Sequence, residues 1–263
     1  MKAYQRVVRE QRAATEGGLT LFGKYWDGLD LRLDNADIRP ITRATAERVV
    51  LDHEWLGTMP AISTHHFGIY FSGVIGGALV FGPEYSENLG WWDRYGFTGR
   101  MILLSRGACM HWTPPNTASY FISRAISLLP PKFEVVTATV DELAGEVGTI
   151  YQSLNWHFVG KMRESNPIAT VRHRDDGYGV VTGGRMYGSR SMRAKMGGTL
   201  AWEEIVKRYP DARKVFQANK SRYFYFRSKR NRRKDLESIT DMVKPYPKRH
   251  EDGPVDGGRA RDC

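Results

Sequence analysis

The chain has 263 residues, of which 41% are hydrophobic and 26% charged, and its formal net charge is +10. This apolar content is enough for a packed core, so disorder throughout the chain is excluded. Two cysteines, Cys109 and Cys263, stand far apart, which argues against a disulfide framework and favours a reducing cytoplasm. The charged start has no apolar signal segment and the apolar runs are interrupted by glycine, so we expect a soluble protein with no membrane partner.

The positive charge is concentrated near the carboxyl end. Residues 201–263 contain 17 Lys and Arg and 10 Asp and Glu, a net charge of +7, and residues 213–234 contain ten basic residues and no acidic one. Such a cluster attracts polyanions by neutralising phosphates and releasing counterions, which predicts nucleic acid as a partner. A solvated basic face is the alternative interpretation.

The hydrophobic pattern predicts helices and strands in a mixed order. Apolar residues at helical spacing predict an amphipathic helix over 42–56, and two apolar runs, 67–71 and 74–81, predict an antiparallel hairpin. The segments expected next are a strand at 101–108, a helix at 116–129, a strand at 133–140, a helix at 145–154, a strand at 157–160, a basic loop at 189–198, a helix at 202–209 and an edge strand at 223–226. Strands joined by helical crossovers predict parallel pairing.

Composition divides the chain into four expected parts. Residues 1–37 are expected to form a polar amino-terminal arm with a short helix, and residues 38–200 the main domain. Residues 201–250 are expected to complete that domain with a helix, the last strand and the basic segment. Residues 251–263 are rich in Gly, Asp and Arg, so they have nothing to bury and are expected to be disordered.

The order of elements resembles that of the Gcn5-related N-acetyltransferase (GNAT) fold. That resemblance implies an α/β fold with a mixed, mostly antiparallel central sheet, a splayed parallel strand pair and flanking helices. Three segments are more specifically similar to the Mom DNA-modification proteins of Mu-like bacteriophages: Leu104-Ser105-Arg106, His111 to Ser119 and Gly145 to Trp156. Looser similarity extends through the Ser189-Arg190-Ser191 loop to residues 220–223 and 245–248.

The Mom resemblance implies a DNA-modifying transferase. Such an enzyme adds an acyl or carbamoylmethyl-type group to the exocyclic amine of adenine in phage DNA, in the host cytoplasm, and so protects the DNA from restriction. The implied partners are DNA and a small-molecule or activated acyl donor, such as acetyl-coenzyme A or an aminoacyl donor. Two alternatives stay open: a GNAT-type acetyltransferase acting on a small amine or a protein, and a DNA-binding accessory protein without activity.

The segment from Thr113 to Ala118 departs from the usual donor-binding turn. GNAT acetyltransferases hold the pyrophosphate of coenzyme A on a glycine-containing turn whose backbone N–H groups approach the phosphates closely. Here the turn contains Pro114 and Pro115, which lack N–H donors, so the standard mode of coenzyme A binding is not favoured. The side chains expected to contact an anionic donor instead are those of Ser105, Asn116, Thr117, Ser119 and Asn155.

Asp141 and Tyr151 are the main catalytic candidates. Asp141 ends a strand where the sheet is expected to open, and a carboxylate there could take a proton from the attacking amine or orient it. Its alternative role is to cap the following helix. Tyr151 stands where this fold often uses a tyrosine as general acid, or it is a buried tyrosine with a satisfied hydroxyl. Glu146 is a weaker candidate, because an acidic residue near a helix start is favourable without any chemistry.

Arg106 and His66 complete the predicted catalytic set. The planar guanidinium of Arg106 suits a carboxylate or phosphate, and a structural salt bridge with Asp141 or Glu146 is the alternative. Asn155 is expected to share the helical face of Tyr151, or else simply to end the helix. His66 could join the site, but ordinary hydrogen-bonded histidines are favoured over a metal site. Cys109, near the end of an apolar strand, is interpreted as core rather than as a nucleophile.

DNA contact is assigned to two basic segments. The residues expected to contact phosphates are Arg190, Arg193, Lys195, Arg222, Lys229, Arg230, Arg232 and Arg233. Because the amine of adenine is paired and stacked in duplex DNA, the base must be flipped out or the strand melted, and Trp91, Trp92 or Tyr95 could fill the gap.

Overall fold

A computed structural model of the chain describes residues 3–16, 26–84, 90, 92–161, 178–199, 201–216 and 220–248. Its helices are α1 (Tyr4–Glu16), α2 (Arg43–His53), α3 (Thr117–Leu128), α4 (Thr149–Ser153), α7 (Ser189–Lys195), α8 (Trp202–Arg208) and α9 (Arg232–Glu237). Its strands are β1 (Asp37–Pro40), β2 (His65–Phe71), β3 (Val74–Gly82), β4 (Met101–Cys109), β5 (Val135–Val140), β6 (His157–Lys161), β7 (Tyr178–Thr182), β8 (Arg185–Tyr187), β9 (Arg213–Phe216) and β10 (Ser221–Phe226). Within the described ranges, no helix is both long and apolar enough to cross a membrane.

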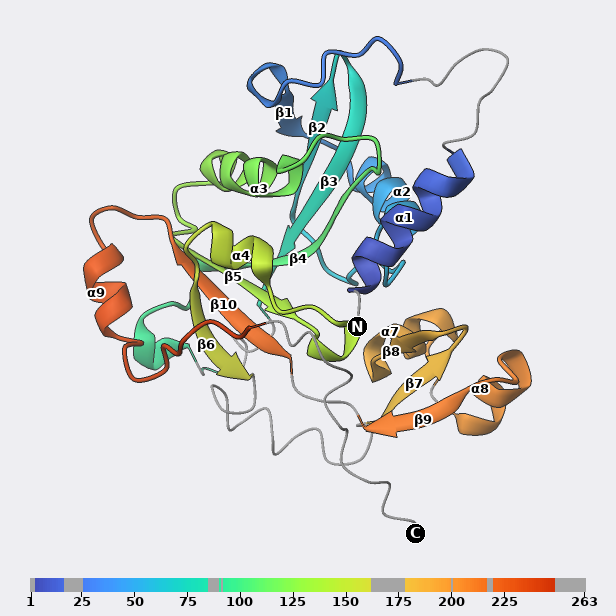
Figure 1. The fold of residues 1–263 in the computed structure, drawn as a ribbon. Helices are drawn as coiled ribbons and strands as arrows, with labels where there is room; N and C mark the ends of the chain where they lie inside the picture. The colour runs from blue at the N-terminus through green and yellow to red at the C-terminus, as the bar shows by residue number, and fades with distance from the viewer. Residues whose placement is uncertain are drawn as a thin grey trace.

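A seven-stranded sheet organises the molecule. Its strands lie in the order β1-β2-β3-β4-β5-β10-β6, and a second sheet has the order β8-β7-β9 (Figure 1). In the large sheet, β4 and β5 are parallel and every other neighbouring pair is antiparallel. The expected mixed α/β fold with one parallel pair and flanking helices is therefore confirmed.

Three sequence predictions about individual elements are wrong. Although the helix α4 connects β5 to β6, these two strands do not pair in parallel, because β10 lies between them. β10 was expected at an edge, but it lies between β5 and β6 and pairs with both, so both of its backbone edges are hydrogen-bonded. The predicted loop at 189–198 contains the helix α7. This segment forms a helix because Met192 is completely buried in the same hydrophobic cluster as Trp55 and Leu56. One buried side chain thus gives an apolar face to a segment that is otherwise basic and polar.

Alternate residues of the central strands build two cores on the two faces of the sheet. Ile102 of β4, Val136 of β5 and Tyr223 of β10 belong to one cluster. Their sequence neighbours Met101 and Phe224, with Val135, belong to another. Successive side chains of a strand point to opposite faces, so this alternation decides which side of the sheet each polar residue of the same strands can reach.

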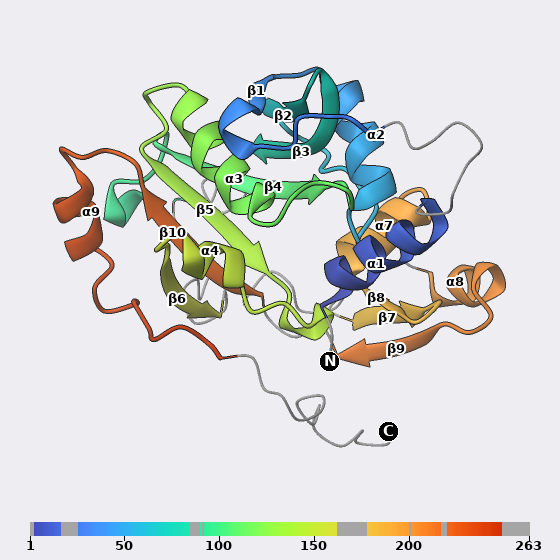
Figure 2. The same ribbon diagram turned by 45° about the horizontal axis from the view of Figure 1, so that its top comes forward.

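The small sheet and α1 pack at the end of α2. Trp55 and Leu56, which follow α2, share a cluster with Val8 of α1 and with residues of β7, α7 and α8. Gln5 of α1 fixes this arrangement, because its side chain donates to the His53 carbonyl at 2.7 Å and accepts from the Trp55 N–H at 2.9 Å. Figure 2 places α1, α7 and the small sheet together, away from α9.

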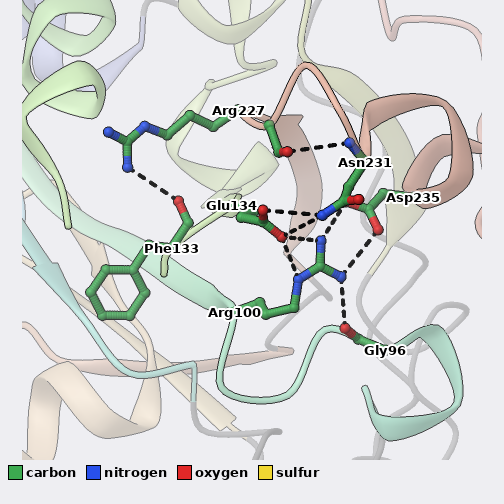
Figure 3. A network of polar contacts seen from close by, with 8 residues as sticks. Gly96, Arg100, Phe133, Glu134, Arg227, Asn231 and Asp235 are labelled. Carbon is green, nitrogen blue, oxygen red and sulfur yellow. Dashed lines mark hydrogen bonds and ion pairs between the residues drawn. The ribbon is translucent and has the colours of Figure 1, made fainter. Parts of the chain in front are cut away.

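A polar network anchors α9 to the opposite end of the molecule (Figure 3). Arg100, just before β4, donates to the two carboxylate oxygens of Asp235 at 3.1 and 2.8 Å and to Glu134 at 2.6 Å. Asn231 also donates to Glu134, at 3.1 and 3.0 Å. Glu134 directly precedes β5, so these contacts fix the basic segment beside the first residues of β5.

Candidate active site

A cavity opens where the two parallel strands separate. β4 and β5 pair from Met101–Val135 to Leu104–Ala138, and there the pairing stops. Beyond that point β4 continues beside β3 and β5 continues beside β10. The cavity has a volume of about 320 Å³ and is lined by β4 residues 104–109, by β5 residues 139 and 140, and by residues of α1, α3 and α4. The sequence predicts that the sheet opens at the end of this strand pair, and the structure has a cavity there.

Arg106 lines this cavity and is held by the segment that follows α2. Its Nε donates to the Thr58 carbonyl at 2.8 Å, and its Nη1 donates to the Ser105 carbonyl at 2.7 Å. The nearest carboxylate is that of Glu54, with 4.0 Å between Arg106 Nε and Glu54 Oε2. Arg106 therefore forms its salt bridge with Glu54 and not with Asp141 or Glu146, the partners that the sequence suggested. The sequence analysis did not identify Glu54.

Glu54 brings a buried carboxylate to the same wall. Its side chain accepts from the backbone N–H groups of Leu56 and Gly57, at 3.2 and 3.1 Å. Burial raises the pKa of Glu54, while the charge of Arg106 and the two N–H groups act in the opposite direction. No local signal marks Glu54 in the sequence, because it simply follows the last turn of α2.

Glu146 is the titratable group best poised for proton transfer. It lines the cavity, and within the described part of the chain its carboxyl group has no hydrogen-bond or ion-pair partner. Burial, followed by the negative charges of Glu54 and Asp141, raises the pKa of Glu146 to about 7. A carboxyl group with such a pKa exchanges its proton near neutrality, as a general base must.

Tyr151 faces the same cavity from α4. Its ring packs against Trp156 and Tyr223, with ring centroids 4.9 and 5.4 Å apart, while its hydroxyl finds no hydrogen-bond partner among the described residues. Burial, then the charge of Glu146, raises the pKa of Tyr151, so its hydroxyl stays protonated at neutral pH. The alternative of a buried tyrosine with a satisfied hydroxyl does not fit this environment.

Gly148 allows α4 to start against β10. Its φ is +70°, a left-handed backbone conformation that residues other than glycine rarely adopt. A Cβ atom at this position would lie 2.5 Å from the Tyr223 ring. Gly148 lies three residues before Tyr151, so this close approach brings α4 to where the ring of Tyr151 packs against that of Tyr223.

Asp141 is not among the residues that line the cavity. It directly follows Val140, is buried, and has its Oδ2 3.9 Å from the ammonium group of Lys220. Its backbone carbonyl accepts from the N–H groups of Ala144 and Glu146, at 3.0 and 3.3 Å. Asp141 therefore positions Glu146 and raises the pKa of that carboxyl group; a direct proton-transfer role for Asp141 stays a prediction.

The expected donor-binding residues divide into two groups. Ser105 lines the cavity, with its hydroxyl donating to the Val80 carbonyl at 2.9 Å. The hydroxyls of Thr117 and Ser119 donate to carbonyls of their own turn, at 2.7 and 3.0 Å, and neither residue lines the cavity. Asn116 is exposed and left-handed, with φ of +65°. The wall that α3 contributes consists of Ala118 and Ile122.

Asn155 does not share a helical face with Tyr151, and that prediction is wrong. α4 ends at Ser153, and Asn155 is an exposed residue with φ of +57°. Its backbone N–H donates to the Gln152 carbonyl at 3.0 Å, which makes it part of the turn that ends the helix. The alternative interpretation, that Asn155 simply ends the helix, is the one that the structure supports.

Comparison with known proteins shows which family the chain belongs to. The model of the Mom protein family matches residues 35–248, most of the chain. The chain belongs to the Mom protein family. A search of curated proteins finds no relative of this Mom-family chain.

Solved structures similar to this Mom-family chain are GNAT acetyltransferases. A GNAT family acetyltransferase from Elizabethkingia anophelis with acetyl-CoA bound is 10% identical, with a TM-score of 0.39, and the match covers 73% of this chain and 99% of that one. An N-acetyltransferase from Staphylococcus aureus is 12% identical, with a TM-score of 0.39 and coverage of 74% and 99%. A polyamine N-acetyltransferase from Drosophila melanogaster is 8% identical, with a TM-score of 0.37 and coverage of 73% and 100%.

His66 lies outside the cavity of the Mom-family chain. On β2, its Nε2 is 2.8 Å from the hydroxyl of Ser63, and burial, followed by the charge of Arg43, lowers its pKa. Its predicted place around the site is not supported. Among the described residues, no group of three His, Cys, Asp or Glu side chains is arranged to hold a metal ion. Cys109 does line the cavity, but burial raises the pKa of its thiol to about 12, which disfavours the nucleophilic thiolate.

The prediction from the sequence that Arg222 contacts DNA is wrong. It alternates with Tyr223 along β10 and faces the same core as Phe224, where only 1% of its surface is exposed. Its Nη2 donates to Glu84 Oε1 at 2.9 Å, and its guanidinium lies 5.1 Å from the centroid of the Trp92 ring. Trp92 is itself completely buried, and Trp91 lies outside the described residues. Arg222 and Trp92 therefore serve packing rather than DNA.

The other residues predicted to contact phosphates lie in two separate regions of the folded Mom-family chain, one around α9 and one on α7. Lys229, Arg230, Arg232 and Arg233 are exposed around α9. Ser221 of β10 pairs with Val140, beside the cavity, whereas Phe226, the end of β10 nearer to α9, pairs with Val135. These two ends of the strand are roughly 16 Å apart, so α9 lies far from the cavity. Arg193 is exposed on α7, where Lys195 lines a neighbouring cavity of about 300 Å³ that shares Glu54 with the first. The side chain of Arg190 lies outside the described part of the structure.

Proposed function

We propose that this chain is a DNA-modifying transferase that adds an acyl or carbamoylmethyl-type group to the exocyclic amine of adenine and so protects phage DNA from restriction in the host cytoplasm. The observation that carries the proposal is the presence of Glu146 and Tyr151 in one cavity between the splayed strands. Membership of the Mom family and an acyltransferase-like architecture support it.

The cavity offers a binding surface for an extended acyl donor. Beyond Leu104, the backbone of β4 pairs with β3 on one side only, so its other edge faces the cavity. Unpaired strand edges present N–H and C=O groups that pair readily with amides. A donor with amide groups, such as acetyl-coenzyme A, fits this edge, although the prolines at 114 and 115 argue against the usual pyrophosphate turn.

Proton transfer is assigned to two side chains. The amine of adenine attacks the electrophilic carbon of the donor, a new N–C bond forms, and the bond from that carbon to the leaving group breaks. Glu146, ionised near neutrality, takes the proton that the nitrogen loses. Tyr151, held protonated by burial, gives its proton to the leaving group. Arg106, fixed on Thr58, supplies positive charge at the wall where negative charge develops.

DNA is the acceptor that the charge of the chain favours. The net charge is +10, and exposed Arg193 stands on α7, the helix whose Lys195 lines the neighbouring cavity that shares Glu54 with the first. Adenine must leave the duplex to reach the cavity, and cationic flanks retain the duplex during that step.

A small cationic amine is the second candidate acceptor. Two carboxyl groups, those of Glu54 and Glu146, line the cavity, and negative charge there attracts a protonated amine. This chemistry would make the protein a small-molecule N-acetyltransferase that does not depend on the basic surfaces.

Mass spectrometry of nucleosides tests the proposal directly. DNA from cells that express the full chain should contain a new adenine-derived nucleoside, and cells that express Glu146→Gln should contain little of it. Glu237→Gln, an exposed substitution on α9, is the matched control and should behave as wild type. Unmodified DNA, together with acetylation of a polyamine by the purified protein, would refute the DNA proposal in favour of the small amine.

A further inference from the structure

Arg9 reaches the cavity from a helix that precedes the Mom-family match. α1 spans Tyr4–Glu16, whereas the family match begins at residue 35. Arg9 is half-buried and lines the cavity beside Cys109. Its positive charge acts on the Cys109 thiol, where it opposes the increase in pKa that burial causes.

The guanidinium of Arg9 is fixed but has spare donors. Its Nη2 donates to the carbonyls of His111 and Thr113, at 3.2 and 2.7 Å. Within the described ranges, its Nε and Nη1 make no hydrogen bond, and no carboxylate lies within ion-pair distance of it. Arg106, the other arginine of this cavity, differs because it faces Glu54 at 4.0 Å.

The cavity is therefore electrically divided. Glu54 interacts with Arg106 and with Glu146, whereas Arg9 interacts with Cys109 and with the carbonyls of His111 and Thr113, which precede α3. Removing a cation from water costs free energy, and without a carboxylate partner part of this cost is not offset in a half-buried arginine. An anionic ligand would offset it. Arginine also suits phosphate oxygens, because its planar fork can bind two of them at once.

The neighbouring turn leaves the task of anion recognition to a side chain. Pro114 and Pro115 contribute no N–H groups, and the hydroxyls of Thr117 and Ser119 are occupied by carbonyls of their own turn. We propose that Arg9 binds the phosphate or pyrophosphate group of the donor, in place of the backbone N–H groups that this turn lacks. The proposal rests on the proposed transferase function and assigns the donor to the Arg9 side and the attacking amine to the Glu146 side.

Calorimetric titration of the full chain with acetyl-coenzyme A and with inorganic pyrophosphate tests this assignment. The wild type should bind both, and Arg9→Gln, which keeps a donor for the two carbonyls but no charge, should bind each about tenfold or more weakly. Arg9→Lys should recover part of the affinity. Arg6→Gln is the matched control, because Arg6 lies on the exposed face of the same helix and pairs with Glu10.

Salt dependence and thermal unfolding separate binding from folding. Affinity of the wild type for pyrophosphate should fall with added salt more steeply than that of Arg9→Gln, while the two unfold at similar temperatures. Equal affinities of wild type and Arg9→Gln, or no binding of either probe by the wild type, would overturn the assignment. Nucleoside analysis of DNA from the same strains reports on the transferase proposal separately, because a modified adenine can form from a donor that does not use Arg9.

Discussion

The guanidinium of Arg222 donates to Glu84 at 2.9 Å, and only 1% and 4% of the two residues are exposed. Glu84 also accepts from the indole N–H of Trp92 at 3.1 Å, and the same guanidinium lies over that ring. The pair thus ties the segment before β4 to β10, a strand that arrives from much later in the chain. An arginine from the most basic part of the sequence is here a member of the core.

Replacing Arg222 with Met should destabilise the protein by about 3–5 kcal/mol, because it removes one partner of the buried ion pair between Arg222 and Glu84. Urea unfolding followed by fluorescence measures this loss. The double variant Arg222→Met with Glu84→Leu should recover most of the stability, since no charge is then buried. A single variant that is as stable as wild type but binds DNA more weakly would show that Arg222 contacts phosphate after all.

The rate of DNA modification should rise with pH through about 7, where Glu146 loses its proton and becomes able to act as a base. The raised pKa of Tyr151 keeps its hydroxyl protonated well beyond this range, so the rate should reach a plateau. Glu146→Gln should lower the plateau about 10²- to 10⁴-fold and remove the inflection near pH 7. An unchanged pH–rate profile in this variant would exclude Glu146 as the base.

The same carboxyl group should make folding stability depend on pH. Its pKa in the folded state, about 7, lies above the ordinary value of 4.5, so the folded protein holds the proton more tightly than the unfolded chain. This contribution, about 3 kcal/mol, is fully present below pH 4.5 and is lost as the pH rises to 7. Comparing the urea stability of wild type and Glu146→Gln at pH 5 and pH 8 measures it, and parallel pH dependences would contradict the burial of Glu146.

Tyr151→Phe should reduce the rate of transfer about 100-fold or more while changing the free energy of unfolding by less than about 1 kcal/mol. The hydroxyl is the proposed proton donor and has no partner among the described residues, whereas the ring keeps its packing against Trp156. Single-turnover assays and thermal unfolding provide the two values. Tyr246→Phe is the control, because that hydroxyl donates to the Trp156 carbonyl at 2.8 Å and should matter for stability alone.

Arg193→Glu should weaken DNA binding and lower the slope of affinity against salt concentration by about one unit, whereas Arg232→Glu should leave the slope close to that of wild type. Both side chains are exposed, but α7 packs beside the cavity and α9 lies at the far end of β5. Fluorescence anisotropy with a short duplex over a range of salt concentrations measures the slopes. The reverse ranking would mean that DNA lies along the carboxyl-terminal basic segment.

The hairpin, the parallel pair and α3 could be predicted because each follows from a local rule. Alternating or continuous apolar runs predict strands, and a run of helical periodicity after Pro114 and Pro115 predicts a helix. The position of Arg222 could also have been read from the alternation of β10, where it shares a face with Phe224 and Phe226. Its basic surroundings in the sequence conceal that signal.

By itself, then, the sequence determined the hairpin of β2 and β3, the helices α2 and α3, and that β4 and β5 run parallel, because these features depend on neighbours along the chain. It also placed the polar residues Arg106 and Tyr151 in the segments around the point where that pair separates. Only the tertiary structure decided that Glu54 and Arg9, separated by tens of residues from β4, line the same cavity. Only burial among carboxylates raised the pKa of Glu146 to about 7. Desolvation and charge pairing depend on distance in space, and no local pattern of residues encodes that distance.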